Sequence, residues 1–393
     1  MADTKNDKNS NSPALRFPGF TEPWKKFALG DLGTSFIGLT YSPKDIVQED
    51  GIIVLRSSNI QDGVLDFNDI VRVSKKIRPS LFTQEDDILI CSRNGSARLI
   101  GKNAIIPKKF SGLTFGAFMM VYRSNQNRFI HHLLNTKRYQ TQVAENLGAR
   151  INQITSSDLN SFDFFFPCEK EQTKIAKFID LINERIATQR RLIEDLEKLK
   201  SSIIDKTFSD VDGEVVKYSD ILKVSNLRND GKSNYIILSA SQEFGMIERE
   251  SLDIDIKAEA KSVKTYKRVL PGDYVLHLRS FQGGLAFAEV EGICSPAYTI
   301  LRPNKRLEYG YLKEYFNSSK FIKSLVLVTY GIRDGRSINV EEFLDMNISI
   351  HNKDKQTEIV KSLSKLSDKL NVEASILNGY EQQRNYLLGK LFI

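Results

Sequence analysis

Arginine, asparagine and glutamine side chains gather in short polar clusters at the ends of predicted strands. Their guanidinium and amide groups can bond the edges of DNA bases through two hydrogen bonds, whereas lysine and serine suit phosphate oxygens. In the first half of the chain the candidate DNA-binding residues are Lys75, Lys76, Arg78, Arg93, Asn94, Arg98, Arg150, Asn152 and Gln153. In the second half they are Arg228, Lys232, Arg279, Ser280, Gln282, Arg333 and Arg336. A solvated loop is the simpler explanation for any one of them, but equivalent positions in both halves, as for Arg93 and Arg279, strengthen the DNA interpretation.

No reaction centre accompanies these clusters. The sequence has no G-x-x-x-x-G-K-[ST] phosphate loop, because the nearest segment, 331–337, lacks both the spacing and the lysine. It has no Asn/Asp-Pro-Pro-aromatic tetrapeptide of the kind found in amino-methyltransferases. Asp253 and Asp255 fit a charged strand edge better than a nuclease centre. The adjacent His131 and His132 belong to no catalytic motif. We therefore expect a binding role, with no catalytic residue and no metal site.

Composition and charge narrow the class of protein. The 393 residues, 41% of them hydrophobic and 27% charged, indicate a globular chain with room for two domains of roughly 150 residues each. The formal charge of +7 is uneven, because residues 1–168 carry 21 basic and 16 acidic groups (+5) and residues 209–350 carry 19 and 20 (−1). Bulk charge is therefore weak support for a polyanion partner.

The chain shows no feature of a secreted or membrane protein. No run of about 18 to 20 apolar residues predicts a spanning helix. Residues 1–14, which we predict to form a disordered tail, have no apolar core of a signal peptide. Cys91, Cys168 and Cys294 are odd in number and far apart, which predicts reduced, mostly buried thiols rather than disulfides or a zinc site. We therefore expect a cytoplasmic protein.

The polar clusters lie in two regions that are predicted to be rich in strands. Short runs of strand-forming residues bounded by turn residues occur at 51–55, 87–90, 118–122, 235–238 and 274–278. One short helix is predicted in each region, at 129–144 and at 311–327.

Each strand-rich region is followed by a long helix, and the two helices repeat one another. Gln172 and Thr173 recur as Gln356 and Thr357, an offset of 184 residues that holds for about 40 residues. Within each copy, apolar residues recur at alternating spacings of four and three from Ile175 and Ile359, the pattern of a coiled coil. The sequence thus predicts an α+β fold in which two strand-rich globules are separated by two long antiparallel helices, with an internal tandem repeat and pseudo-two-fold symmetry.

The register of the helix pair follows from that symmetry. Polar residues interrupt the two seams at the equivalent positions Gln189 and Glu373, which we expect to face each other. Facing positions should then have numbers that sum to about 562, as in Ile175 with Leu387 and Ile203 with Ile359.

The arrangement resembles the specificity (S) subunit of a type I restriction-modification system, over nearly the whole chain. The resemblance is carried by the opening Leu15-Arg-Phe-Pro-Gly-Phe20, by residues 24–32 that follow it, and above all by the Gln-Thr-containing helices at 169–208 and 353–392. It implies target-recognition domain 1 at 15–168, a central spacer helix at 169–208, target-recognition domain 2 at 209–350 and a C-terminal spacer helix at 351–393.

Membership of this family implies a non-catalytic subunit that reads a bipartite sequence in double-stranded DNA, one half-site per globule. It also implies two modification (methyltransferase) subunits and restriction (translocase) subunits as partners, in which S-adenosylmethionine, ATP and Mg would be bound; no cofactor is expected in this chain. The half-sites should lie in successive major grooves with a spacer of about six base pairs. The alternatives are a stand-alone nuclease or methyltransferase and a structural coiled-coil adaptor.

The exposed flanks of the long helices are the expected docking surface for the modification subunits. The candidate partner-binding residues are Glu184, Arg185, Arg190, Arg191, Asp368 and Lys369.

Overall fold

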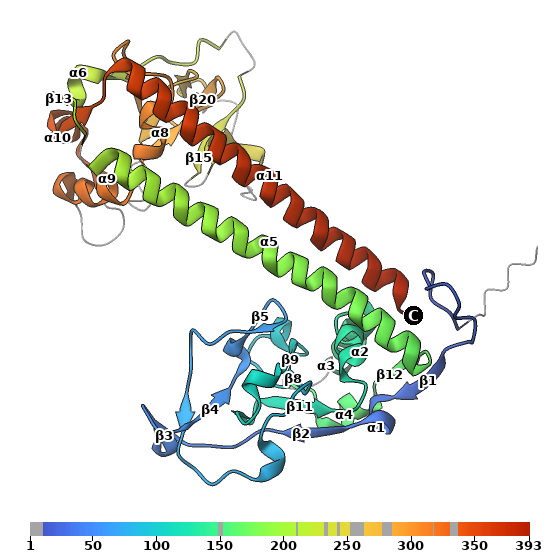
Figure 1. Cartoon of the computed structure of the whole chain (residues 1–393). Helices are drawn as coiled ribbons and strands as arrows, with labels where there is room; N and C mark the ends of the chain where they lie inside the picture. The colour runs from blue at the N-terminus through green and yellow to red at the C-terminus, as the bar shows by residue number, and fades with distance from the viewer. Residues whose placement is uncertain are drawn as a thin grey trace, which may run out of the picture. The chain divides into compact units, whose positions relative to one another are not determined.

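The computed structural model describes residues 11–147, 152–209, 211–231, 235–241, 244–251, 263–276, 285–316, 318–330 and 337–393. Residues 1–10 of the predicted tail lie outside the described residues. The chain forms two compact units, Met1–Thr188 with Ile376–Ile393, and Gln189–Ser375. The long helices α5 (Glu169–Ser209) and α11 (Lys353–Leu391) each contribute one end to each unit (Figure 1).

A four-stranded antiparallel sheet organises the first unit. Its strand order is β2 (Thr34–Ile37), β11 (Met119–Arg123), β8 (Ile88–Cys91) and β9 (Asn103–Ile105). All four residues of β8 are buried, because alternate side chains enter cores on opposite faces of the sheet. Ile88 and Ile90 join one core, and Leu89 and Cys91 join the other.

Smaller sheets complete the first unit. The second sheet has the order β10 (Thr114–Phe115), β4 (Ile52–Leu55), β7 (Arg72–Val73) and β3 (Ile46–Val47). Strands β5 (Ile60–Gln61) and β6 (Val64–Leu65) form a hairpin, and β1 (Lys25–Ala28) pairs antiparallel with β12 (Asp163–Phe166). In β12, Phe164 and Phe166 are buried while the residues between are not, as their alternation predicts.

The second unit has a central sheet of the same pattern. Its order is β14 (Leu222–Ser225), β21 (Thr299–Pro303), β18 (Tyr274–Leu276) and β19 (Ala286–Phe287), again all antiparallel. Strand β13 (Glu214–Lys217) pairs with β24 (Asn347–Ile350), as β1 pairs with β12. The remaining pairs are β15 (Leu238–Ser241) with β16 (Gly245–Glu248), β17 (Lys267–Val269) with β20 (Gly292–Cys294), and β22 (Thr329–Tyr330) with β23 (Ser337–Ile338). The two units therefore share their central topology and differ in their smaller sheets.

A buried ion pair stands at the same place in both central sheets. Asp87, just before β8, accepts two hydrogen bonds from Arg123, at 2.8 and 2.7 Å. Asp273, just before β18, accepts two from Arg302, both at 2.8 Å. Each aspartate is almost fully buried, so each needs its arginine.

The predicted short helices are each divided in two, which corrects both predictions. The segment predicted at 129–144 forms α2 (Asn127–Leu133) and α3 (Lys137–Leu147), and the segment predicted at 311–327 forms α8 (Tyr311–Tyr315) and α9 (Ser319–Ser324), followed by the 3₁₀ turn Leu325–Val328. The breaks occur where hydroxyl side chains bond the backbone: Thr136 Oγ1 donates to Leu133 O at 2.7 Å, and Ser318 caps α9 by accepting from Phe321 N.

One predicted strand was misplaced. A strand was predicted at 235–238, but the observed strand β15 begins only at Leu238. The residues before it make a single β-bridge, between Ile237 and Ile293. Short helices at equivalent places close each unit: α1 (Leu29–Leu32) and α4 (Ser156–Ser161) in the first, α6 (Tyr218–Ile221) and α10 (Val340–Asp345) in the second.

The repeated Gln-Thr pair fixes the start of each long helix. Gln172 Nε2 donates to Pro167 O at 3.0 Å, and Gln356 Nε2 donates to His351 O at 2.9 Å, so each amide reaches the carbonyl five residues earlier. The following Thr173 and Thr357 each donate to the carbonyl four residues before them. These bonds satisfy backbone groups around the first turn, which explains why both residue types recur.

The helices pair antiparallel, as predicted. Gln189 Nε2 donates to Glu373 O at 3.0 Å, and in the first unit Ile175 shares a core with Leu388, against which Leu387 packs. Figure 1 shows α5 in green and α11 in red running side by side in opposite directions.

Near the end of α5, the predicted core position is wrong by one residue. Ile203 is 38% exposed, and Ile204 instead joins the core that contains Ile359. A straight α-helix turns 100° per residue, so a position 29 residues after Ile175 returns to its face, whereas one 28 residues after it does not. In α11, Leu388 is likewise the buried residue 29 positions after Ile359.

The segment before β1 packs onto the long helices in the first unit. Arg16 donates through Nε and Nη2 to both carboxylate oxygens of the fully buried Glu171, each at 2.8 Å. Leu15 N donates to Lys390 O at 2.9 Å, and the ring of Phe17 meets that of Phe178 edge-on at 5.6 Å. Residues 11–14 of the predicted tail belong to this packed segment, since Asn11 O accepts a hydrogen bond from Trp24 N. Within the described part of the chain, no helix is long and apolar enough to cross a membrane.

Candidate nucleic-acid interface

Arg93 lies where three chain segments are bonded to one another: residues 92–93, residue 118 and residues 153–154. We call this arrangement the Arg93 platform. Arg93 follows β8, and its backbone N–H donates to Phe118 O at 3.0 Å. Ser92 donates to the same carbonyl through both N and Oγ, each at 3.0 Å. Arg93 also forms a β-bridge with Gln153, next to Ile154, whose N–H donates to Ser92 O. The backbone of Arg93 is therefore held from two directions.

The side chain of Arg93 projects outward over an exposed ring. Its guanidinium carbon lies 5.1 Å from the centre of the Phe118 ring, in a cation–π contact. Phe118 is 57% exposed although its carbonyl is tightly bonded. Phe118 was not among the candidate residues predicted from the sequence, although it begins a predicted strand and has a repeat counterpart in Tyr298.

Asn94 and Asn152 organise the loop beside Arg93. Asn94 Nδ2 donates to Ser57 Oγ at 3.1 Å, and its Oδ1 accepts from Ser96 N at 3.0 Å. Asn152 Nδ2 donates to Gly95 O at 3.0 Å, and its carbonyl accepts from Asn94 N. The structure thus brings Arg93, Asn94, Asn152 and Gln153 together, while Arg150 lies outside the described residues.

The next candidates are three basic residues that follow β7. Lys75, Lys76 and Arg78 are exposed. Lys75 Nζ donates to Thr40 O at 3.1 Å and lies 3.4 Å from Asp45 Oδ2. Lys75 therefore has local partners of its own, and no described contact joins these three residues to the platform of Arg93.

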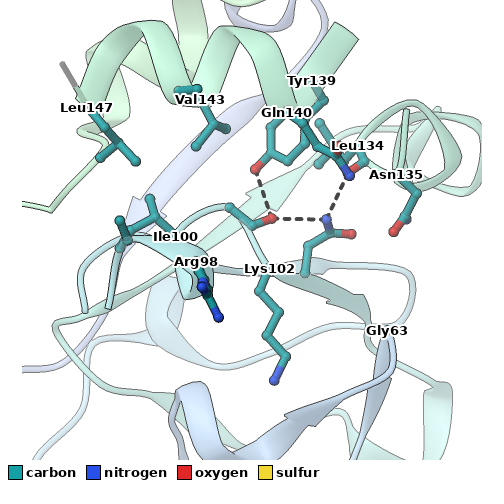
Figure 2. A pocket seen from close by; sticks show the side chains of 14 residues that line it. Gly63, Arg98, Ile100, Lys102, Leu134, Asn135, Tyr139, Gln140, Val143 and Leu147 are labelled. Carbon is teal, nitrogen blue, oxygen red and sulfur yellow. Dashed lines mark hydrogen bonds between the residues drawn. The ribbon is translucent and has the colours of Figure 1, made fainter. Parts of the chain in front are cut away.

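Arg98 lines a cavity of about 400 Å³ between the segment 97–103, residues 134–135 and helix α3. Figure 2 shows Tyr139, Val143 and Leu147 on the α3 side and Arg98 with Lys102 opposite them. The Tyr139 hydroxyl and Asn103 Nδ2 both donate to Gly101 O at 3.1 Å, and Asn103 Nδ2 also donates to Leu134 O. Burial raises the pKa of the Tyr139 hydroxyl, so that it stays a protonated donor. These bonds stiffen the loop that carries the exposed Arg98.

One of the seven candidate DNA-binding residues in the second half of the chain, Arg228, lies within the described residues. Arg228 is exposed and forms a β-bridge with Lys267, whose Nζ donates to Tyr298 O at 2.6 Å. The other six candidates, Lys232, Arg279, Ser280, Gln282, Arg333 and Arg336, lie outside the described residues.

The candidate partner-binding residues lie on the two long helices. Glu184, Arg185, Arg191, Asp368 and Lys369 are exposed, and Arg190 is half-buried. Glu184 and Arg191 are seven residues apart and so share a face of α5. Lys369 is already engaged in an ion pair with Glu373.

A row of exposed leucines on α5 was not predicted. Leu181, Leu192 and Leu199 are 51%, 41% and 50% exposed, and spacings of 11 and 7 residues place them on one face. Leu192 has its repeat equivalent in Ile376 on α11, which is 38% exposed. Apolar side chains that remain exposed in a row indicate a protein-binding surface.

The titratable groups of the described residues make no cluster of three or more metal-ligating side chains. His132 Nε2 lies 2.8 Å from Asp180 Oδ1 of α5, which ties α2 to the long helix. The neighbouring His131 is buried, and this desolvation, together with the nearby His132, lowers its pKa to about 3. Cys91 and Cys294 are buried, Cys168 is exposed, and all three are free thiols.

Residues 21–198, which include the Arg93 platform and most of α5, match the family model described as the type I restriction modification DNA specificity domain. This stretch of the chain is similar to a type I specificity domain. The type I restriction enzyme StySPI specificity subunit of Salmonella potsdam and the EcoKI specificity subunit of Escherichia coli K12 are each 26% identical to it over 186 residues. These matches cover 45% of this chain, and they span 40% of the length of each relative.

The fold of the specificity domain and its repeat also has a solved counterpart. The S subunit of a type I restriction-modification system from M. genitalium superposes with a TM-score of 0.59 at 16% identity. That match covers 97% of this chain and 99% of the other, so the shared fold includes both units and both long helices.

Proposed function

We propose that this chain is the DNA-specificity subunit of a type I restriction-modification complex, reading one half-site of a bipartite target with each unit. The observation that carries the proposal is the repeated central sheet: β2-β11-β8-β9 in one unit and β14-β21-β18-β19 in the other. A scaffold built twice presents two reading surfaces of the same kind. The match of residues 21–198 to the DNA specificity domain supports DNA recognition by the first unit, and the shared topology supports the same role for the second.

The long helices would set the gap between the half-sites. Helix α5 has 41 residues, which at 1.5 Å each extend about 60 Å, much more than a connection between two domains needs. The bond between Gln189 and Glu373 fixes the register of the pair, because a slip of either helix would leave Glu373 without its amide partner. The gap in the DNA target should therefore have one fixed length.

Arg93 is the best-supported base-reading residue of the first unit. Its backbone is fixed, its guanidinium is exposed, and an arginine fork can bond both acceptors of a guanine. We assign Lys75, Lys76 and Arg78 to phosphates, since exposed cations after a strand position a protein on DNA without reading sequence. By the repeat, Arg279 would serve the second half-site as Arg93 serves the first.

Two modification subunits would dock on the long helices, and restriction subunits would join them. The exposed leucine row, flanked by Glu184 and Arg191, offers apolar contact with a charged rim, the usual composition of an interface. S-adenosylmethionine, ATP and Mg would be bound by those partners. Relatives named specificity subunits agree with a chain that recognises DNA and leaves the chemistry to other subunits. The complex would work in the cytoplasm, where its DNA substrate is found.

A selection experiment tests the proposal against its two competitors. The chain is co-expressed with its modification subunits, and the purified complex selects DNA from a random library at two salt concentrations. We expect two short conserved half-sites with a gap of fixed length, bound less tightly at higher salt. A structural adaptor would retain no DNA in the complex. A stand-alone enzyme would turn over DNA when the chain is assayed without partners, with metal or with a methyl donor.

A further inference from the structure

Arg93 differs from the other arginines that stack on aromatic rings. In the described part of the chain the stacked arginines are Arg93, Arg123, Arg138, Arg249 and Arg268. The last four also donate their guanidinium hydrogens to protein acceptors: Arg123 to Asp87, Arg138 to Asp163, Arg249 to Ser239 and Arg268 to Glu291. Within the described residues Arg93 makes no such bond, so none of its guanidinium hydrogens is donated to a described acceptor.

The ring beneath Arg93 is held as firmly as the arginine itself. Phe118 O accepts from Ser92 N, Ser92 Oγ and Arg93 N, all at 3.0 Å, so the two backbones are bonded to each other. Phe118 nevertheless leaves 57% of its surface in water, while its neighbour Met119 in β11 is buried. Because exposing a large ring forfeits its hydrophobic stabilisation, the exposure favours an apolar contact made only when DNA is bound.

We propose that Phe118 is a positioning and specificity residue: it orients Arg93 toward a guanine and contacts the C5-methyl group of a thymine in the adjacent base pair. The inference rests on the proposed function and names the base step that its first unit reads.

The chemistry of the two side chains defines that step. The cation–π contact with Phe118 restricts the fork of Arg93, and guanine offers the matching acceptors, O6 and N7, in the major groove. The Phe118 ring lies 5.1 Å from the guanidinium carbon and would reach the base next to that guanine, and thymine is the base that presents a methyl group in the major groove. Cytosine presents a polar amine in the same groove, so it would leave the ring without an apolar partner. Arg93 and Phe118 together would therefore prefer guanine next to thymine.

The experiment uses the complex of the full chain with its modification subunits and its selected target DNA. In the first half-site each thymine is replaced in turn by uracil, which removes only the methyl group, and each guanine by 7-deazaguanine, which removes N7. Dissociation constants are measured for the unaltered chain, Phe118→Ala and Ile37→Ala. Ile37 is a matched control, since it is 51% exposed at the end of β2 in the same sheet.

We expect one uracil substitution to weaken binding of the unaltered chain about 3- to 10-fold and to have no effect on Phe118→Ala. One adjacent 7-deazaguanine should weaken the unaltered chain more, about 5- to 150-fold, and weaken Phe118→Ala less. Ile37→Ala should behave as the unaltered chain. Because the Phe118 ring is exposed, its removal should leave the unfolding transition unchanged.

Three results would overturn the proposal. One is a selected half-site for the first unit in which no guanine lies next to a thymine. The second is a Phe118→Ala complex that loses affinity equally for target and scrambled DNA, which would make the ring a non-specific contact. The third is a Phe118→Ala complex as sensitive to uracil as the unaltered one. If the unaltered complex itself fails to distinguish target from scrambled DNA, the proposed function fails with it, whereas the first three results leave that function standing.

Discussion

Gln189 on α5 donates a hydrogen bond to the backbone carbonyl of Glu373 on α11 at 3.0 Å, and the two residues are repeat equivalents 184 positions apart. A residue that meets its own equivalent lies next to a local two-fold axis, which requires the helices to be antiparallel. Gln189 also donates to the Glu373 carboxylate, at 2.5 Å. The centre of the helix pair thus holds a polar contact that specifies one register.

Stability should depend on pH through Glu373. Hydrogen bonds from Lys369 and then from Gln189 lower the pKa of this carboxyl below its usual 4.5. A group whose folded pKa is lowered contributes stability above its unfolded pKa and loses it as pH falls through the folded value. We expect Glu373→Gln to be less stable than the unaltered chain at pH 7, and this difference in the free energy of unfolding to shrink as the pH falls below 4.5. Urea unfolding at a series of pH values measures the difference.

The control for that titration is Glu358→Gln. Glu358 lies on the same helix in an exposed ion pair with Lys355, so its removal should change stability little at any pH. If the difference in the free energy of unfolding between Glu373→Gln and the unaltered chain stays constant from pH 7 to 3, the carboxylate does not stabilise the helix pair.

The packed segment before β1 should contribute strongly to the stability of the first unit. Arg16→Ala leaves the fully buried Glu171 carboxylate without its arginine, which should cost about 3 to 5 kcal/mol. Arg128→Ala, which removes an exposed pair with Asp86, should cost about 0 to 1 kcal/mol. Denaturant unfolding compares the two. Equal losses would mean that Glu171 finds another partner or admits water.

Assembly should depend on the charged flank of α5. Reversing Arg190 and Arg191 to glutamate should reduce co-purification with the modification subunits without unfolding the chain. Lys108 and Lys109, exposed on the 3₁₀ turn Lys108–Phe110, supply a matched double reversal away from the long helices. If both double variants retain the partners at the original stoichiometry, the docking face lies elsewhere, and Leu192→Asp in the leucine row is the next position to change.

Each unit should control one half-site. Arg93→Ala should relax recognition of the first half-site only, and Arg279→Ala that of the second only, each by about 1 to 3 kcal/mol. Binding to targets altered in one half-site at a time gives both effects. An equal loss on every DNA sequence would assign the two arginines to phosphate contacts.

Features that follow from the seam spacing and the internal repeat were predictable from the sequence, and contacts that depend on how strands and loops pack were not. The long helices, their antiparallel pairing and the facing of Gln189 with Glu373 follow from seam spacing and the offset of 184. The burial of Ile204 in place of Ile203 did not follow, because a heptad template ignores the turn of a straight helix. The pairing of Phe118 with Arg93 depends on how β11 lies against β8, which no local spacing reveals.

The structure brings some of the candidate site residues together and gives others local partners, which the sequence did not distinguish. Arg93 and Gln153 face each other in a β-bridge across 60 residues of chain, and only equivalent positions in the two halves singled out such arginines beforehand. The amides of Asn94 and Asn152 looked like base readers, yet both bond the loop itself. Residue type alone does not distinguish a side chain that reads DNA from one that builds the loop beside it.

Methylation mapping of the host genome, with and without this gene, tests the central claim most directly. If the chain is a two-site reader, deleting its gene should abolish adenine methylation at one motif made of two half-sites and a gap of fixed length, and restoring the gene should bring that motif back. An unchanged methylation map, or the loss of a single uninterrupted motif, would contradict the claim that each unit reads one half of a bipartite target.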